Sequence, residues 1–252
     1  MTAPPYVDGH GLLAGKGVLV TAAAGSGIGF ATAKRCAEEG ARVVLSDRHE
    51  RRLAEAAGEL GVLGVPCDVT REHDVEGLFA AAADELGGID VLVNNAGLGG
   101  TAALHEMTDE QWNVVIDVTL NGTFRCTRAA LRHMYERGSG VIVNNASVLG
   151  WRAQAGQAHY AAAKAGVMAI TRCAAIEAAP RGVRVNAVAP SLAMHANLAK
   201  ATSDELLEEL TTREAFGRAA EPWEVANVIV FLASDYSSYM TGEVVSVSSQ
   251  RA

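Results

Sequence analysis

The chain has 252 residues, of which 49% are hydrophobic and 20% are charged, and its formal net charge at pH 7 is −8. These totals are typical of a well-packed globular protein and exclude a disordered one. The acidic balance argues against nucleic acid as a partner, and no run approaches the ~18 uninterrupted apolar residues of a membrane span.

The cysteines and the first residues of the chain indicate in which cellular compartment we expect the protein. The cysteines stand at positions 36, 67, 126 and 173, with the spacing of neither a zinc site nor a disulfide framework. The first residues lack a basic segment followed by an apolar one, so we expect no secretory signal. The sequence predicts a cytoplasmic protein with no metal site, whose partners include neither membrane nor nucleic acid.

Short apolar runs alternate with longer segments of helical composition. The strand-like runs span residues 17–22, 41–46, 61–68, 89–96, 140–147, 183–190 and 243–248. The intervening segments have acidic starts and a glycine just past their ends, as helices do. Strands that are apolar almost throughout indicate a parallel sheet covered on both faces. The predicted class is α/β, a Rossmann-like doubly wound sheet of about seven strands with helices on both faces.

The domain organisation follows from the same pattern. No internal repeat, low-complexity tract or linker interrupts it, so we expect residues 1–252 to form a single dinucleotide-binding catalytic domain. The long stretch 191–222 lies outside the alternation and follows the sixth predicted strand. Because ligands of doubly wound sheets bind beyond the carboxyl ends of the strands, we expect a substrate lid at about 191–220.

The turn after the first predicted strand is rich in glycine and reads TAAAGSGIGF, from Thr21 to Phe30. Small residues there let backbone N–H groups approach a pyrophosphate, and the helix N-terminus adds a favourable dipole. The common G-x-G-x-x-G spacing is absent, and the glycines alone are equally compatible with a simple tight turn. With the β–α alternation around it, we interpret the turn as a cofactor site of altered spacing, formed by Gly25, Ser26, Gly27, Ile28 and Gly29.

An acid follows at the end of the second predicted strand. Asp47 lies ~20 residues beyond the turn, where a carboxylate can hydrogen-bond both ribose hydroxyls of the adenosine half. A carboxylate there repels a 2′-phosphate, so the sequence predicts NAD rather than NADP. Arg48 weakens this preference, because a neighbouring guanidinium could accept the phosphate instead.

The segment NNASVLGWRAQAGQAHYAAAKAG carries the candidate catalytic residues. Tyr160 and Lys164 are four apart and share one helix face, while Ser147 lies at the carboxyl end of a predicted strand. A phenol has a reference pKa of ~10, and a neighbouring ammonium lowers it. We therefore expect Lys164 to bring the pKa of Tyr160 closer to the range of a proton shuttle, with Ser147 holding the substrate oxygen and a nicotinamide carrying the hydride.

These motifs resemble the short-chain dehydrogenase/reductase family from about residue 12 to residue 248. The matching segments are GSGIG (25–29), CDVT (67–70), NNAG (94–97), Ser147, YAAAK (160–164), RVNAVAP (184–190) and YMTGE (239–243). The resemblance implies an NAD(P)-dependent enzyme that interconverts secondary alcohols and ketones. It further implies cofactor contacts from Asp68 and Val69 (adenine), Asn95, Ala96 and Gly97 (adenine ribose), Tyr160 and Lys164 (nicotinamide ribose), and Pro190, Ser191 and Leu192 (nicotinamide).

The first half departs from the family at the glycine turn. The family usually has T-G-x-x-x-G-I-G, whereas this chain has Ala22 in place of the first glycine and one residue more before GIG. We expect Gly25 to absorb the extra residue while Gly27, Ile28 and Gly29 keep the helix entrance.

The second half departs at two positions. The family commonly has a catalytic Asn in its long fourth helix that holds a water between the catalytic Lys and solvent. This chain has Thr119 there, which we include among the catalytic residues as a less direct substitute. Asn121 would face elsewhere on a helix. After Pro190 the family has Gly and then a Thr that binds the nicotinamide amide; here Ser191 and His195 occur, and His195 either replaces that contact, approaches the substrate or lies on a surface loop.

The substrate prediction also comes from resemblance. The segments TAAAGSGIG, NNASVLGWRAQ, EAFGRAAEPWEVA and SSYMTGEVVSVSSQRA are similar to a reductase of bacterial steroid degradation, which acts on an acyl-CoA thioester of the bicyclic C/D-ring remnant. This implies that residues 98–103 and the lid enclose a bulky alicyclic group. Candidate contacts at the pocket rim are Trp151 and Arg152, and candidates for the CoA phosphates are Arg152, Arg213 and Arg218, each of which could instead be an ordinary surface residue.

Two other functions remain open. A 3-oxoacyl-ACP or 3-oxoacyl-CoA reductase has the same catalytic residues and is the alternative enzyme. A non-catalytic nucleotide-binding scaffold is the other, motivated by the departures at Ala22, Thr119 and His195.

The predicted helices 109–137 and 157–179 bear on assembly. Both are long and carry small and apolar residues on more than one face, which indicates burial beyond one subunit. We expect a homo-oligomer, and the family resemblance implies a tetramer.

Overall fold

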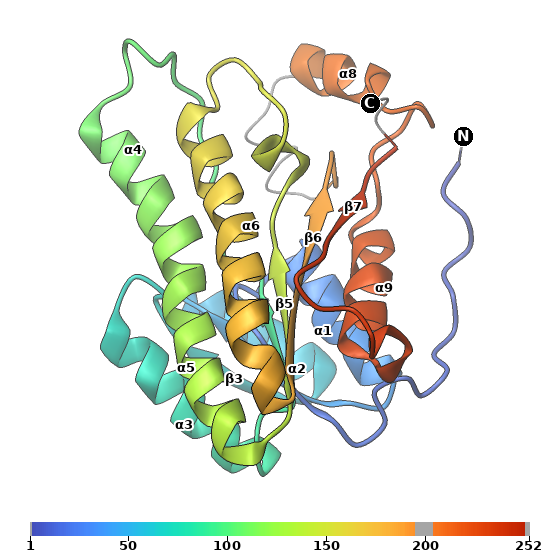
Figure 1. Ribbon diagram of the computed structural model, residues 1–252. Coiled ribbons are helices and arrows are strands. Elements are labelled where there is room, and N and C mark those ends of the chain that lie inside the picture. The colour runs from blue at the N-terminus through green and yellow to red at the C-terminus, as the bar shows by residue number, and fades with distance from the viewer. Residues whose placement is uncertain (1, 195–203, 250–252) are drawn as a thin grey trace.

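The computed structural model describes residues 2–194 and 204–249. Within them, one seven-stranded parallel sheet has the order β3-β2-β1-β4-β5-β6-β7 (Figure 1). Its strands are β1 (Gly17–Val20), β2 (Arg42–Asp47), β3 (Leu63–Pro66), β4 (Val91–Asn94), β5 (Gly140–Asn145), β6 (Val183–Pro190) and β7 (Val244–Val247). Each strand overlaps a run predicted from the sequence, and the doubly wound α/β fold is confirmed.

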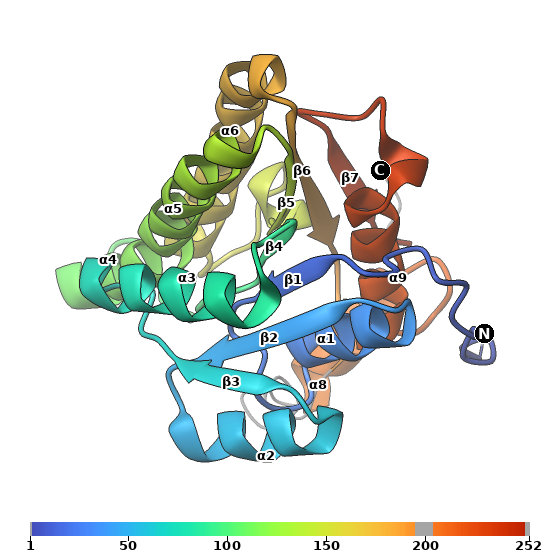
Figure 2. The same cartoon turned by 90° about the horizontal axis from the view of Figure 1, so that it is seen from below.

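Helices cover both faces of the sheet (Figure 2). One face carries α1 (Ile28–Glu38), α2 (Glu50–Leu60) and α9 (Pro222–Ala233). The other carries α3 (Glu72–Leu86), α5 (Gly122–Arg137) and α6 (Ala158–Ala178). Two shorter helices are α4 (Asp109–Ile116) and α8 (Asp204–Thr212).

Strand β1 shows how the sequence builds a core on each face. Val18 and Val20 belong to the core beneath α1 and α9, whereas Leu19 belongs to the core beneath α3 and α5, and all three are fully buried. Successive side chains of a strand point to opposite faces, so a sheet covered on both sides needs apolar residues at every position. Each such side chain stabilises the fold by roughly 1.5–3 kcal/mol, which makes the sheet a rigid frame for its loops.

The crevice of the sheet lies between β1 and β4. The chain runs outward from β1 to β3 and then returns to the other side of β1 as β4. Helix α1 follows β1, whereas α5 follows β4 after the shorter α4, and α1 and α5 lie on opposite faces. The two loops therefore diverge at the carboxyl ends of the strands, where doubly wound sheets bind their ligands in a crevice. The glycine turn and the NNAG loop are these two loops.

The helical segment expected at 109–137 is interrupted by one wider turn. The π-helical turn Asp117–Asn121 joins α4 to α5. It carries Thr119, which is fully buried. Single π-helical turns often occur at functional sites, since they redirect one side chain without ending the helix.

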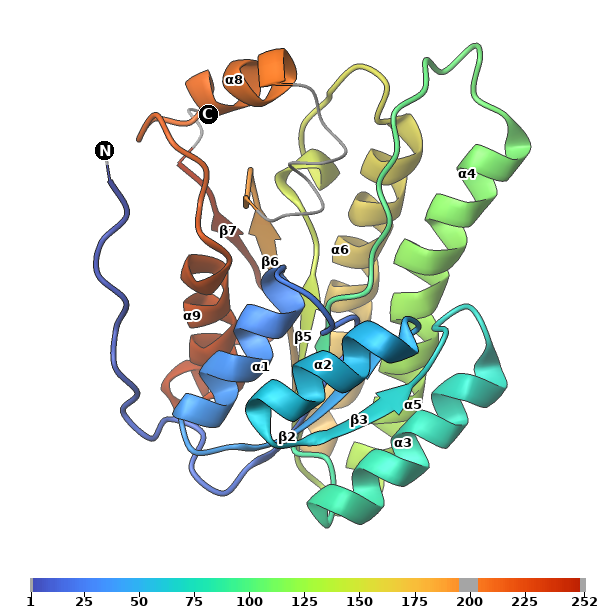
Figure 3. The same cartoon turned by 180° about the vertical axis from the view of Figure 1, so that it is seen from behind.

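The expected lid begins after β6. Within the described residues it includes α8 and a bridge between Ala193 and Ala220. Figures 1 and 3 show α8 at the end of the molecule where the strands of the sheet terminate. His195 lies outside the described residues, and the lid stays a prediction.

None of the helices in the described part of the chain is long and apolar enough to cross a membrane.

Candidate active site

The glycine turn presents the start of α1 to the crevice. Gly27 is the N-cap of this helix, no side chain caps it, and its first turn contains no acidic residue. The first backbone N–H groups and the positive end of the helix dipole are therefore available to an anion such as a pyrophosphate. The predicted phosphate-contact residues 25–29 all lie in this turn.

Backbone angles explain how the turn accommodates its altered spacing. Gly25 has φ +99°, a conformation that residues with side chains rarely adopt, and this is compatible with the expectation that Gly25 absorbs the extra residue. Ala22 has φ +50°, a left-handed conformation that is strained for an L-residue. The glycine that the family usually has at this position would adopt it without strain.

Gly29 packs so closely against the NNAG loop that no side chain fits. A Cβ at Gly29 would lie 2.4 Å from both the Ala22 oxygen and Asn95 Nδ2. Asn95 Nδ2 donates to that oxygen at 3.0 Å, and the Asn95 N–H donates to Thr21 Oγ1 at 3.0 Å. The NNAG loop is thus held against the end of β1 beside the phosphate turn.

Asp47 lies beside the same turn. Its Oδ2 accepts from the Ala24 N–H at 3.2 Å, and its Oδ1 accepts from the His49 N–H at 2.9 Å. These bonds fix the carboxylate at the end of β2, next to the glycine turn. Its position is that expected for a group that recognises the adenosine ribose.

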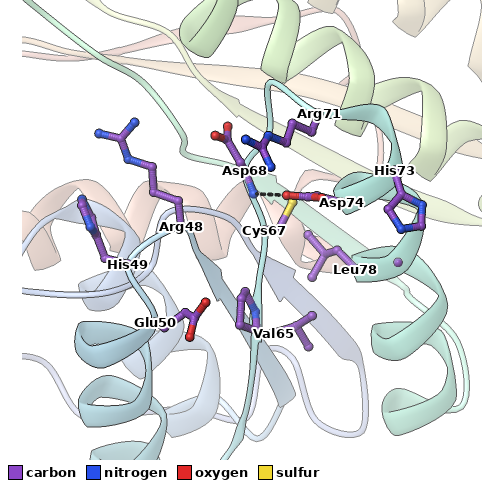
Figure 4. A pocket seen from close by; sticks show the side chains of 12 residues that line it. Arg48, His49, Glu50, Val65, Cys67, Asp68, Arg71, His73, Asp74 and Leu78 are labelled. Carbon is purple, nitrogen blue, oxygen red and sulfur yellow. Dashed lines mark hydrogen bonds between the residues drawn. The ribbon is translucent and has the colours of Figure 1, made fainter.

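Arg48 lines a neighbouring cavity of about 660 Å³ together with Asp68 and Arg71 (Figure 4). Burial opposes ionisation of Asp68, but hydrogen bonds from Thr70 and the positive charges of Arg48 and Arg71 outweigh it and lower the pKa of this carboxyl. The charge of Arg48 is therefore partly compensated by Asp68. Next to Asp68, Val69 is buried and packs against Gly122 of α5.

Two hydrogen-bonded side-chain amides connect the glycine turn to the end of β5, where the candidate catalytic residues lie. Because the Ala22 oxygen can only accept, Asn95 directs Nδ2 toward it and leaves Oδ1 to accept from Asn145 Nδ2 at 2.9 Å. The orientation of both amides is thereby fixed. Asn145 Oδ1 is left on the far side of this chain, and it is buried without a hydrogen-bond partner in the described residues.

Lys164 also contacts Asn145, at the end of β5. Its Nζ donates to the Asn145 main-chain oxygen at 2.5 Å, and the side chain is almost completely buried. A Cβ on Gly97 would lie 3.3 Å from this Nζ, so the NNAG loop reaches the lysine as well. Burial lowers the pKa of Lys164 to about 8, and at pH 7 the ammonium form still predominates.

Ser147, Tyr160 and Lys164 lie together at the carboxyl end of β5. The Ser147 hydroxyl hydrogen-bonds with Tyr160, and Lys164 Nζ lies 5.6 Å from the centre of the Tyr160 ring. The expectation that Lys164 lowers the pKa of Tyr160 was wrong: burial dominates and raises this pKa, while the hydrogen bond with Ser147 lowers it in part. Tyr160 is a protonated phenol at neutral pH.

Comparisons with known proteins match most of the length of the chain. Residues 22–249 match a family model described as enoyl-(acyl carrier protein) reductase. A (5R,7aS)-5-hydroxy-7a-methyl-1-oxo-2,3,5,6,7,7a-hexahydro-1H-indene-carboxyl-CoA reductase of Mycobacterium tuberculosis is 62% identical over 98% of this chain and 97% of its own. A 3-oxoacyl-acyl-carrier-protein reductase of Vibrio cholerae is 40% identical over 94% of this chain and 97% of its own.

A solved structure has a similar fold over the whole chain. The crystal structure of a short chain dehydrogenase from Mycobacterium smegmatis has a TM-score of 0.89 and 59% identity, covering 100% of this chain and 99% of its own. The chain is a short-chain dehydrogenase/reductase. It is an oxidoreductase, and its family uses a nicotinamide dinucleotide, NAD or NADP.

The residues of this short-chain dehydrogenase/reductase fit such a cofactor. The uncapped start of α1 suits the pyrophosphate, and Asp47 suits the adenosine ribose. The orphaned Asn145 Oδ1 is a buried acceptor in need of a donor, next to the lysine expected to bind the nicotinamide ribose. When bound, the nicotinamide supplies or accepts the hydride of the reaction.

Thr119 occupies the position where the family commonly has Asn. Its hydroxyl accepts from the Leu98 N–H at 3.0 Å and donates to the Leu98 oxygen at 3.2 Å. Thr119 therefore fixes the loop that follows NNAG, and a direct role in proton transfer stays a prediction. Asn121 donates to Asp117 at 3.1 Å, in the same π-helical turn.

The residues expected beside the nicotinamide end β6 and begin the lid. The Ser191 N–H donates to the Val247 oxygen at 3.2 Å, which continues the pairing of β6 with β7 beyond Pro190. Leu192 is buried, and its N–H donates to Glu214 at 3.4 Å. These contacts hold residues 191 and 192, the start of the expected lid, at the carboxyl end of the sheet.

The structure separates the three arginines proposed for CoA phosphates. Arg218 forms a two-pronged pair with Glu224, at 2.6 and 2.8 Å, and also donates to the Ala219 oxygen. Arg152 and Arg213, by contrast, line one cavity, although they are far apart in the sequence. Trp151 is exposed beside Arg152.

Two residues near the site were missed by sequence reasoning. Asn145 stands inside the quoted NNAS segment, but nothing in the sequence indicates that its amide would bridge to Asn95. His159 precedes Tyr160 and is buried, and a Cβ on Gly100 would lie 3.2 Å from its Nε2. Its Nδ1 accepts from the Tyr160 N–H at 2.9 Å, so in the neutral imidazole the proton is on Nε2.

Proposed function

We propose that this enzyme transfers a hydride between NAD(H) and a secondary alcohol or ketone on an acyl-CoA-linked alicyclic substrate derived from steroid rings. The observation that carries the proposal is the 62% identity over 98% of the chain to the hexahydroindene-carboxyl-CoA reductase. The grouping of Ser147, Tyr160 and Lys164 at the carboxyl end of β5 supplies the chemistry.

The protonation states suit the roles that the reductive step requires. Burial keeps the Tyr160 phenol protonated, which is the form that donates a proton to a ketone oxygen as the carbonyl carbon receives the hydride. Ser147, hydrogen-bonded to Tyr160, holds the same oxygen. Lys164 is mainly an ammonium at neutral pH and stabilises the phenolate left behind. The ketone thereby gains one hydride and one proton to become a secondary alcohol.

NAD is the proposed cofactor. The Asp47 carboxylate is fixed beside the glycine turn, where it would accept from ribose hydroxyls and repel a 2′-phosphate. The only nearby cation that weakened this preference on sequence grounds, Arg48, has its charge partly compensated by Asp68. The proposed set of cofactor contacts also includes residues 25–29, Asp68, Val69, 95–97, Tyr160, Lys164 and 190–192.

The alternative is a 3-oxoacyl thioester reductase, and the 40% identity to the Vibrio cholerae enzyme favours it. Steady-state assays with NADH would separate the two. We expect the CoA thioester of a bicyclic ketone to give a higher kcat/KM than a linear 3-oxoacyl-CoA of similar carbon number. A linear thioester that is reduced far faster than the bicyclic one would overturn the proposed substrate.

Assembly is proposed to be homotetrameric. Helices α4, α5 and α6 expose large apolar side chains, among them Trp112, Phe124 and Ile176, the last of which is 78% exposed. Apolar surface of this kind on long helices supports burial against other copies of the chain. Light scattering at micromolar concentration is expected to give four times the 26.2 kDa chain mass, and a monomer would contradict the proposal.

A cytoplasmic location is proposed with it. In the described residues all four cysteines are free, with Cys36, Cys67 and Cys126 buried and Cys173 exposed. Free thiols of this kind are typical of a reducing compartment.

A further inference from the structure

A cavity of about 640 Å³ is lined in part by the loop that follows Ser147. Segments 149–154 and 212–217 line it, so it joins the loop after β5 to the end of α8. The loop is tied to the site, because the Leu149 N–H donates to Ser147 Oγ at 3.2 Å and Leu149 itself lines the cavity. Figures 1 and 3 show this loop and α8 at the same end of the molecule.

The charged groups of this cavity are unevenly exposed. Arg213 is exposed and Arg152 is half-buried, whereas Glu214 is only 4% exposed. Both Glu214 oxygens are engaged inside the protein: one accepts from the Leu192 N–H at 3.4 Å and the other from the Ser249 hydroxyl at 2.7 Å. Among the charged residues that line the cavity, the two arginines are therefore more exposed to solvent than the glutamate.

The pairing of Arg213 leaves it able to change partners. Arg213 contacts Glu209 one turn earlier on α8, and the two side chains are 50% and 57% exposed. Exposed pairs of this type contribute little, so a ligand with several negative charges can displace the carboxylate. Arg218 differs, because its two-pronged pair with Glu224 is only 19% and 22% exposed.

We propose that Arg152 and Arg213 bind the phosphate groups of the CoA moiety of the substrate. The inference rests on the proposed function, since it requires an acyl-CoA substrate. Guanidinium groups bind phosphate through two parallel N–H···O bonds, and two of them on separate segments suit a ligand with several phosphates. The pantetheine arm places these phosphates away from the reacting carbonyl, which matches a cavity beyond Ser147 rather than at Tyr160.

The test compares two thioesters of the same bicyclic keto acid at saturating NADH. One is the CoA thioester, and the other is the pantetheine thioester, which lacks all phosphates. For the natural chain we expect a KM at least ~10-fold lower for the CoA thioester. Arg152→Ala and Arg213→Ala are each expected to reduce this KM ratio ~3- to 10-fold, and the double variant to bring it close to one.

Matched variants control for structure. Arg172→Ala removes an exposed arginine of α6 outside the cavity and is expected to keep the full KM ratio. Arg152→Lys keeps the charge and is expected to retain part of the ratio. If Arg152→Ala does not fold, Arg152→Gln replaces it, and free CoA serves as a competitive inhibitor whose Ki must rise in the variants.

Each outcome decides one question. If the natural enzyme reduces neither thioester, the proposed function fails. If it reduces both with equal KM, or if both arginine variants keep the natural KM ratio, the phosphate site is wrong and the proposed function stands. A fall in kcat of equal size on both thioesters with an unchanged KM ratio would also overturn the site, because the arginines would then act only by holding the Ser147 loop.

Discussion

Lys164 Nζ donates a hydrogen bond of 2.5 Å to the main-chain oxygen of Asn145, whose own side chain reaches the NNAG loop. Asn145 of β5 thus connects Lys164 to the NNAG loop, which is expected to contact the cofactor. The preceding residue, Asn144, is fully buried and donates to Thr171 Oγ1 at 2.9 Å on the opposite face of the sheet. The two neighbouring asparagines therefore have different contacts, and substituting each one should have a different effect.

Asn145→Val keeps the main-chain oxygen and removes the amide. We expect a loss of only ~1 kcal/mol in the free energy of unfolding but a clear rise in the KM for NADH, because the orphaned acceptor and the bridge to Asn95 are lost. Asn144→Val is expected to do the reverse, costing ~2–4 kcal/mol while leaving the KM unchanged. Urea denaturation and steady-state kinetics measure both quantities. Equal effects of the two substitutions on KM would contradict this assignment.

Lys164→Met is predicted to stabilise the protein while it abolishes turnover. Burial lowers the pKa of Lys164 from 10.5 to about 8, so the unfolded chain binds more protons between these two values and stability rises with pH across that window. Below pH 8 the buried ammonium is a full cost, and its removal is expected to add on the order of 2–3 kcal/mol at pH 7. This gain should shrink as the pH rises from 8 toward 10.5.

The control for that substitution is Lys34→Met, on the exposed side of α1. Chemical denaturation at pH 7 and at pH 9.5 gives the difference for each variant. A Lys164→Met protein that is less stable than the natural one at pH 7 would show that the bond to Asn145 outweighs the desolvation of the ammonium.

Ala22→Gly is predicted to stabilise the glycine turn. Ala22 has a left-handed backbone, and relief of its strain exceeds the extra chain entropy of glycine in the unfolded state, for a net gain of roughly 0.5–1 kcal/mol. Ala23→Gly is the matched control, because Ala23 is fully buried without such strain, and that substitution should destabilise. Denaturation curves in which both variants lose stability to the same extent would disprove the strain.

Asp47→Asn is predicted to weaken the preference for NADH over NADPH by at least ~10-fold, because it removes the charge that repels a 2′-phosphate while keeping an oxygen for the Ala24 N–H. Arg48→Ala is the comparison, and it should leave the kcat/KM for NADH nearly unchanged. The readout is the ratio of kcat/KM for the two cofactors. A natural enzyme that prefers NADPH would contradict the role given to Asp47.

The fold could be predicted from the sequence because this fold depends on local patterns of apolar residues. Apolar runs such as GVLV and ARVVLS can be buried on both sides only in a covered parallel sheet, and their order of alternation with helices determines the crossovers. The positions of the glycine turn, Ser147, Tyr160 and Lys164 could be predicted for the same reason, since each follows a strand or shares a helix face. The interruption of the 109–137 helix by a π-helical turn was missed, because apolar spacing near 3.6 residues tolerates one wider turn.

Contacts between distant segments could not be predicted in this way. The hydrogen bond between the Asn95 and Asn145 side chains depends on the register of β4 against β5, which composition does not specify. The protonation of Tyr160 was wrongly expected, because spacing placed Lys164 nearby but did not reveal that burial would dominate the pKa. Arg152 and Arg213 were considered singly, and their shared cavity appears only once the loop after β5 meets the end of α8.

The proton donated by Tyr160 is the central claim, and Tyr160→Phe tests it most directly because it removes one oxygen atom and leaves the ring. The measurement is NADH-dependent reduction of a bicyclic keto acyl-CoA at saturating substrate, with NADH affinity and melting temperature followed in parallel. We predict a fall in kcat of ~100- to 10,000-fold, with the NADH affinity and the melting temperature nearly unchanged. A variant that folds, binds NADH and keeps more than about a tenth of the natural turnover would contradict the account.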